Sequence, residues 1–162
     1  MSAAPAIKAE SVRRILAGYK PNDRSALVNV LHDVQSAFRY LPRQALEMTA
    51  SHLGLSPARV FEVATFYEGF HLKPRGEHTC TVCMGTACHV RGSPRLLEQL
   101  ERDLGVGAGQ TTADLKFTLE EVNCVGACAL GPLVIIDGNY NGNMTSARLT
   151  RLVKGMQKKG KK

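Results

Sequence analysis

Cysteine is the residue type whose spacing in this chain most clearly suggests chemistry. The 162 residues include five cysteines in two groups, Cys80, Cys83 and Cys88 in one stretch and Cys124 and Cys128 in another. Thiolates bind soft metals, form disulfides or act as redox nucleophiles. Which of these applies depends on the spacing of the cysteines and on the elements that carry them.

Secreted disulfide frameworks are disfavoured by the odd number of cysteines and by an N-terminal stretch without an apolar signal segment. A chain of this length can also bury a core without covalent staples. No apolar run approaches the roughly 20 residues of a membrane-spanning helix. We therefore expect a soluble, cytoplasmic protein with no direct membrane insertion.

The spacing of four cysteines favours a metal cluster. Cys83 and Cys88 form a C-x4-C pair, and Cys124 and Cys128 form a C-x3-C pair. Structural zinc usually uses tight pairs with about two to four intervening residues, so these two spacings are at the loose end for zinc. A [2Fe-2S] cluster is larger, each iron takes two cysteines, and a longer loop spans it without strain. The spacing thus favours iron–sulfur, with zinc, redox thiols and buried cysteines as alternatives.

Cys80 is a separate case. With Cys83 it forms a C-x2-C pair, which could be a redox dithiol or half of a metal site. If residues 78–82 form a strand, however, the Cys80 side chain points to one face of a sheet from within that strand. We therefore predict that Cys80 is a buried structural residue.

The first half of the chain has the periodicity of helices. Apolar residues recur every three or four positions in a helix predicted over about 23–39, and two further helices are predicted from Pro42 to Gly54 and from Ser56 onward. Members of the first apolar face are Leu27, Val30, Leu31, Val34 and Phe38. Gly69, Pro74 and Gly76 then interrupt the periodicity and indicate a junction.

The second half alternates short apolar runs with helical patterns. Strands are predicted at 78–82, 117–122, 133–137 and near Tyr140, helices over 94–104 and around 149–156, and a loop over 105–112. Asp137-Gly138 predicts a hairpin turn between the last two strands. Each cysteine pair lies in a loop after a predicted strand. Gly85 or Gly126 lies inside the loop, so that the backbone can approach the sulfur atoms and direct N–H groups at them.

The sequence offers little support for nucleic-acid binding, dinucleotide binding or a role for histidine. The net charge of +7 comes partly from a basic C-terminal tail, which we expect to be a solvated helix end without nucleic-acid binding, because no aromatic residues alternate with the lysines. Residues 105–109, GVGAG, do not satisfy a dinucleotide fingerprint. His71, His78 and His89 could donate hydrogen bonds near the cysteines, although solvated or packed histidines are expected.

Three stretches together resemble a known family: VATFYEGF at 63–70, KPRGEHTCTVCMGTACHVRGSP at 73–94 and EVNCVGACALGP at 121–132. They are similar to the thioredoxin-like [2Fe-2S] subunit of complex I (its 24 kDa subunit), NAD-linked hydrogenases and formate dehydrogenases. The resemblance implies an α+β protein, with an N-terminal helical bundle (1–72) and a thioredoxin-like α/β domain with a mixed sheet and the basic tail (73–162).

The resemblance also implies the site and its partners. Cys83, Cys88, Cys124 and Cys128 would bind one [2Fe-2S] cluster, and a partner subunit would hold FMN and bind NAD(P). The chain would transfer single electrons beside further iron–sulfur or catalytic subunits, and would not catalyse the full reaction alone. A soluble hydrogenase or formate dehydrogenase is expected; the alternatives are complex I, a zinc-binding assembly module and a thiol oxidoreductase using Cys80 and Cys83.

Aromatic residues before the junction form a second candidate surface. Phe66, Tyr67 and Phe70 are predicted either to dock a partner or to pack between the helices and the second domain. Both interpretations stay open at this point.

Overall fold

The computed structural model describes residues 8–159, and the chain divides into two compact units, Met1–Arg75 and Gly76–Lys162. We call them the helical unit and the sheet unit. Each has its own buried apolar core. The predicted basic tail runs past the described part of the chain, because Lys161 and Lys162 lie outside it.

The helical unit is built from short helices around one core. Its elements are α1 (Ala9–Leu16), the 3-10 helix η1 (Arg24–Ala26), α2 (Leu27–Phe38), α3 (Arg43–Leu53) and α4 (Pro57–Phe66). The apolar face predicted for α2 is confirmed, since Leu27, Val30, Leu31 and Val34 are buried. Gly54 ends α3 at a φ of 62°, and the Ser56 hydroxyl accepts a hydrogen bond at the start of α4, as expected.

Two features of the helical unit differ from the predictions. The helix expected from residue 23 begins as an α-helix only at Leu27, because the Asp23 carboxylate accepts the Ser25 N–H and caps the tighter turn η1 instead. Helix α1 was not predicted, although it buries Val12 and Leu16. Its eight residues offer too few apolar positions to indicate a helix.

The sheet unit confirms the α+β class and the mixed sheet. Its strands are β1 (His78–Cys83), β2 (Gln110–Thr111), β3 (Phe117–Val122), β4 (Val134–Ile136) and β5 (Asn139–Asn141), in the spatial order β2-β3-β1-β4-β5. β1 runs parallel to β3 and antiparallel to β4. β4 and β5 are joined by the predicted two-residue turn, in which Asp137 and Gly138 both have positive φ.

Three short elements of the sheet unit were missed, among them the 3-10 helix η2 (Cys128–Leu130). Residues 105–112 were predicted as a loop, but β2 pairs Gln110 with Leu119 and Thr111 with Thr118. Helix α5 (Thr86–Val90) lies where an irregular cysteine loop was expected. A strand of two residues and a helix of five are too short to show a periodic apolar pattern. Both form because they pair with or pack against other parts of the chain.

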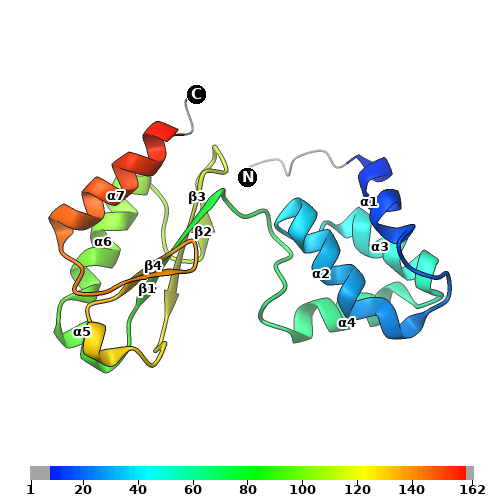
Figure 1. Ribbon diagram of the computed structural model, residues 1–162, viewed down its shortest axis with the longest axis horizontal. Helices are drawn as coiled ribbons and strands as arrows, with labels where there is room; N and C mark the ends of the chain where they lie inside the picture. Colours follow the sequence, from blue (N-terminus) through cyan, green and yellow to red (C-terminus); the bar gives the residue numbers. More distant parts are fainter. Residues whose placement is uncertain (1–7, 160–162) are drawn as a thin grey trace. The chain divides into compact units, whose positions relative to one another are not determined.

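Helices α6 (Ser93–Leu104) and α7 (Ser146–Lys159) lie side by side beside the sheet (Figure 1). They pack Leu96, Leu100 and Leu149 into the core around β1 and β3. The centre of this core also holds Cys80 and Leu119, both fully buried. The predicted strand and helix pattern after residue 76 is thus correct for the longer elements.

A helix that spans a membrane must be both long and apolar. Over residues 8–159, none of the helices is long and apolar enough to cross a bilayer.

Two glycines of the sheet unit predict opposite effects on stability. A Cβ at Gly76 would lie 2.6 Å from the backbone N and C atoms of Phe117, so Gly76→Ala should lower the unfolding free energy by about 1–3 kcal/mol. Gly155 lies in α7 with nothing within 4 Å, so Gly155→Ala should raise it by about 0.5–1 kcal/mol. Native-state hydrogen exchange of the β1 and β3 amides measures both, and an unchanged Gly76→Ala variant would contradict the close approach.

Candidate metal centre

Four thiols gather where β1 ends. Cys83 is the last residue of β1, Cys88 lies in α5, Cys124 follows β3, and Cys128 begins the 3-10 helix η2 (Cys128–Leu130). The sulfur atoms of Cys124 and Cys128 are 3.9 Å apart, and the thiols of Cys88 and Cys124 lie within hydrogen-bond reach of Cys83. The structure therefore brings together the four cysteines that were predicted as ligands.

The parallel register of β1 and β3 accounts for this convergence. Cys83 pairs with Val122, and the Met84 N–H donates to the Val122 carbonyl at 2.7 Å. Parallel strands leave a sheet at the same edge, so the residues that follow them enter the same space. We call residues 83–91 the first cysteine segment and residues 123–133 the second cysteine segment.

Gly85 permits the two segments to approach each other closely. A Cβ at this position would lie 2.5 Å from the Asn123 carbonyl oxygen and 3.1 Å from the Cys124 Cβ. The first distance is far below van der Waals contact with a backbone atom, so any side chain here would push the segments apart. Glycine is required by the approach, as the sequence indicated.

Gly126 and Gly131 shape the second cysteine segment. Gly126 has a φ of 80°, which favours glycine, and its N–H donates to the Cys124 sulfur at 3.4 Å. A Cβ at Gly131 would come within 3.1 Å of the Cys88 sulfur. The second segment therefore lies directly against a thiol of the first.

Backbone N–H groups surround three of the sulfur atoms. Gly85 and Val125 donate to Cys83, Leu133 donates to Cys88, and Gly126 donates to Cys124. Such donors are fixed by the fold and stabilise negative charge on sulfur without adding an ionic group. The sequence predicted this role for the glycines, whereas Val125 and Leu133 carried no signal because any residue can supply a backbone N–H.

The thiols influence each other's ionisation. Burial raises the pKa of Cys83, but the N–H donors and neighbouring thiols outweigh burial, so this pKa lies below its ordinary value. Burial and then the hydrogen bond with Cys83 raise the pKa of Cys88, and the hydrogen bond with Cys124 and its charge raise that of Cys128. Once one thiol has ionised, its negative charge disfavours ionisation of the neighbouring thiols. A bound metal cation neutralises this charge and allows the other thiols to ionise.

Burial is unequal across the four thiols. Cys83 and Cys88 are each 2% exposed, whereas Cys124 and Cys128 are exposed. An open hollow beside them is lined by Met84, Gly85, Thr86, Ala87, Val90, Arg91, Asn123, Cys124 and Cys128. One side of the site therefore faces the interior of the sheet unit and the other side faces outward.

The donor set fits a cluster held by pairs of thiolates. A [2Fe-2S] cluster needs two cysteines on each iron, soft thiolate donors and N–H groups directed at sulfur. The paired thiols and the N–H donors supply these features.

Cys80 lies apart from this group, in the core of the sheet unit. It is fully buried and pairs with Leu119 on one side and Ile136 on the other. Burial, with a smaller contribution from the charge of Asp137, raises the pKa of its thiol to about 12. The predicted burial of Cys80 within a strand is confirmed, and such a thiol is a poor nucleophile.

The three histidines have different surroundings. His78 begins β1, opposite the end that carries Cys83, and its Nδ1 lies 2.7 Å from the Asp137 carboxylate. The His71 Nε2 atom forms a hydrogen bond with the Arg75 guanidinium in the helical unit. His89 lies exposed in α5, inside the first cysteine segment.

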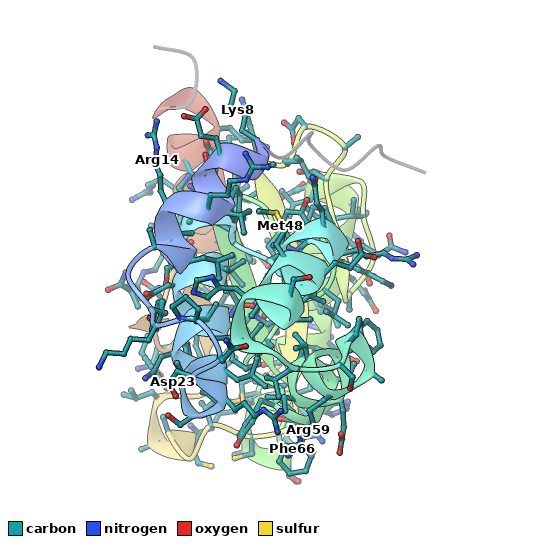
Figure 2. The ribbon with its side chains drawn as sticks, turned by 90° about the vertical axis from the view of Figure 1, so that its right-hand side faces the viewer. Lys8, Arg14, Asp23, Met48, Arg59 and Phe66 are labelled. Carbon is teal, nitrogen blue, oxygen red and sulfur yellow. The ribbon has the colours of Figure 1, made fainter. Side chains whose placement is uncertain are left out.

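The aromatic residues before the junction divide into two kinds. Phe70 is only 8% exposed and belongs to the core of the helical unit, whereas Phe66 and Tyr67 are 76% and 48% exposed. Phe66 and Arg59 lie at the same end of this unit and both line an open hollow (Figure 2).

Arg91 was not singled out by the sequence analysis. Its guanidinium donates to backbone carbonyls of the second cysteine segment, including that of Cys128 at 3.0 Å. An arginine three residues after a cysteine is compatible with many roles. Only the folded chain shows which acceptors it reaches.

Residues 12–157 match the family described as thioredoxin-like [2Fe-2S] ferredoxin. The HndA protein of the NADP-reducing hydrogenase of Solidesulfovibrio fructosivorans is 35% identical over 133 residues, which cover 82% of this chain and 78% of that protein. An NADH-quinone oxidoreductase subunit of Rhizobium meliloti (strain 1021) is 38% identical over 148 residues, which cover 91% of this chain and 88% of that protein.

A crystal structure of an NAD+-reducing [NiFe]-hydrogenase in the air-oxidized state shares the fold. The TM-score is 0.70 at 24% sequence identity, and the match covers 86% of this chain and 23% of that chain. The chain thus corresponds to about a quarter of that larger hydrogenase chain.

The pKa of Cys80 predicts slow alkylation of the metal-free chain. At pH 9 a thiol with a pKa of about 12 is thiolate in about one molecule in a thousand, so iodoacetamide should modify Cys80 far more slowly than the exposed Cys124. The rate at Cys80 should rise about tenfold for each pH unit between 9 and 11, because the thiolate is the reacting form. Peptide mass spectrometry measures both rates, and equal rates at pH 9 would contradict the burial of Cys80.

Proposed function

The chain belongs to the thioredoxin-like [2Fe-2S] ferredoxin family, and from this we propose that it is an electron-transfer subunit of an NAD(P)H-linked oxidoreductase. One [2Fe-2S] cluster is held by Cys83, Cys88, Cys124 and Cys128. The observation that carries the proposal is the convergence of these four thiols under backbone N–H donors.

The bound cluster would supply a one-electron acceptor. The residues of the chain hold it and stabilise the negative charge on its thiolate ligands. Cys83 and Cys88 hold the buried side, where the N–H groups of Gly85, Val125 and Leu133 stabilise their negative charge. These donors change little when an electron arrives, because they are part of fixed backbone. Such a rigid, preorganised setting favours rapid electron exchange.

The exposed side is where a partner must approach. Cys124 and Cys128 are exposed, and Val90 (80% exposed) and Leu130 (44% exposed) lie on the adjoining cysteine segments. Apolar side chains exposed beside a redox site are suited to a protein contact that excludes water. We propose that electrons enter or leave through this face.

The partner is a flavin-bearing subunit that binds NAD(P). Hydride transfer moves two electrons, and a flavin can release them singly, which matches a subunit that carries one electron at a time. The hydrogenase relative supports a hydrogenase complex. A formate dehydrogenase complex rests on the sequence resemblance alone, and we propose a location in the cytoplasm for either one. The NADH-quinone oxidoreductase relative supports a complex of that kind as the second candidate, and the proteins that co-purify with the native chain would distinguish the two.

Chain isolated without oxygen should contain iron and acid-labile sulfide, about two of each per chain, and give an electron paramagnetic resonance signal only after reduction. Cys124→Ser should lose or alter that signal, because it removes a thiolate ligand. Cys80→Ala should retain the signal and the iron content, at a cost of about 1 kcal/mol in stability for the lost buried sulfur.

Three outcomes would contradict the proposal. Colourless chain with stoichiometric zinc would favour the structural zinc module. Insulin reduction that depends on Cys80 and Cys83 would favour a thiol oxidoreductase. Cluster loss in Cys80→Ala together with retention in Cys124→Ser would overturn the ligand assignment.

The proposed contact face predicts an effect of charge at Val90. In the complex isolated from its native source, Val90→Glu should slow reduction of the cluster by NADH or NADPH roughly tenfold, because a carboxylate in an apolar contact must be desolvated. Val90→Ala is the matched control and should change the rate little. Stopped-flow absorbance measures the rate, and a Val90→Glu complex as fast as the Val90→Ala complex would place the electron path elsewhere.

A further inference from the structure

Arg91 joins the two cysteine segments. It ends the first cysteine segment, and its Nη1 donates to three carbonyl oxygens of the second: Cys128 at 3.0 Å, Gly131 at 3.3 Å and Ala129 at 3.4 Å. One side chain thus reaches most of the turn that carries Cys128.

The carbonyls that Arg91 binds belong to a helix end with few donors of its own. η2 is a 3-10 helix of three residues, and its last carbonyls have no continuing helix to supply N–H groups. The Gly131 N–H reaches the Cys128 carbonyl at 3.2 Å, and the Asn143 N–H reaches that of Leu130 at 2.7 Å. The Arg91 Nη1 group adds a second donor to the Cys128 carbonyl and also reaches the carbonyls of Ala129 and Gly131.

The turn held by Arg91 also contacts the first pair of cysteines. A Cβ at Gly131 would lie 3.1 Å from the Cys88 sulfur and 3.4 Å from the Arg91 Cδ, so Gly131 lies between them. The Leu133 N–H, two residues further on, donates to the Cys88 sulfur. Movement of this turn would therefore displace Cys128 and disturb the surroundings of Cys88 at the same time.

Arg91 also brings a positive charge to the rim of the site. Together with Cys124 and Cys128 it lines the open hollow. One-electron reduction adds one negative charge to the site, so a nearby cation favours the reduced state and raises the reduction potential. Because Arg91 is exposed, solvent and salt reduce this effect without abolishing it.

From these contacts we propose that Arg91 is a positioning residue for the cluster, which locks the second cysteine segment onto the first and raises the reduction potential. The electrostatic part rests on the proposed function, whereas the locking of the segment is a property of the chain itself. Nothing in this role requires Arg91 to touch the partner.

Arg91→Gln, Arg91→Lys and Arg102→Gln test the proposal. Arg102 is an exposed arginine near the far end of α6, so its substitution removes the same charge away from the site. In metal-free chain, Arg91→Gln should speed amide hydrogen exchange of residues 126–133 by roughly two- to tenfold, the range for losing exposed hydrogen bonds to a charged donor. Arg102→Gln should leave that exchange unchanged.

In cluster-loaded chain, Arg91→Gln should shift the midpoint potential to a more negative value and speed iron loss to a chelator. Arg91→Lys keeps the charge, but its shorter side chain does not extend as far as the arginine Nη1, so it should restore the potential more than the rate of iron loss. A redox titration followed by electron paramagnetic resonance separates the two effects.

An Arg91→Gln variant that matches Arg102→Gln in exchange, iron loss and potential would overturn the proposal. Failure of the proposed function would be distinct, because it would appear in the unsubstituted chain as missing iron and a missing resonance signal. The exchange measurement on metal-free chain tests the locking role in either case.

Discussion

Parallel hydrogen bonding between β1 and β3 sets where the four thiols can lie. Cys83 pairs with Val122 at the ends of these strands, so both cysteine segments start from the same edge of the sheet. A slip of one residue would turn every β1 side chain to the opposite face and move Cys83 out of the site. Gly85 then allows the segments to touch, because its missing Cβ leaves space for Asn123 and Cys124.

Charge is the second constraint on this site. The hydrogen bond with Cys124 and then its charge raise the pKa of Cys128, so thiolates held together at this site repel one another. Backbone N–H donors oppose this repulsion at Cys83, Cys88 and Cys124, and Arg91 binds the turn that carries Cys128. Cys124 and Cys128 are accessible while Cys83 and Cys88 are shielded, which suits a centre that exchanges electrons with another protein.

Sequence reasoning succeeded where a local pattern has one strong physical cause. The buried face of α2, the glycine that ends α3, the hairpin turn at Asp137 and Gly138 and the burial of Cys80 all follow from periodicity or backbone preference. Sequence reasoning did not predict several short elements, among them α1, η1, β2 and α5. Each of these is short, and each is stabilised by contacts with residues distant in the chain or by a competing cap.

Taken alone, the sequence determined which residues could form the site, because cysteine type, spacing and neighbouring glycines restrict the chemistry to soft-metal binding or thiol redox reactions. It also determined the mixed α+β class, since helical periodicity fills the first half of the chain and short strands alternate with helices in the second half. Tertiary structure decided which thiols are buried, which N–H groups face sulfur and which carbonyls Arg91 binds. These features depend on pairing between segments about 40 residues apart, and no local propensity encodes that distance.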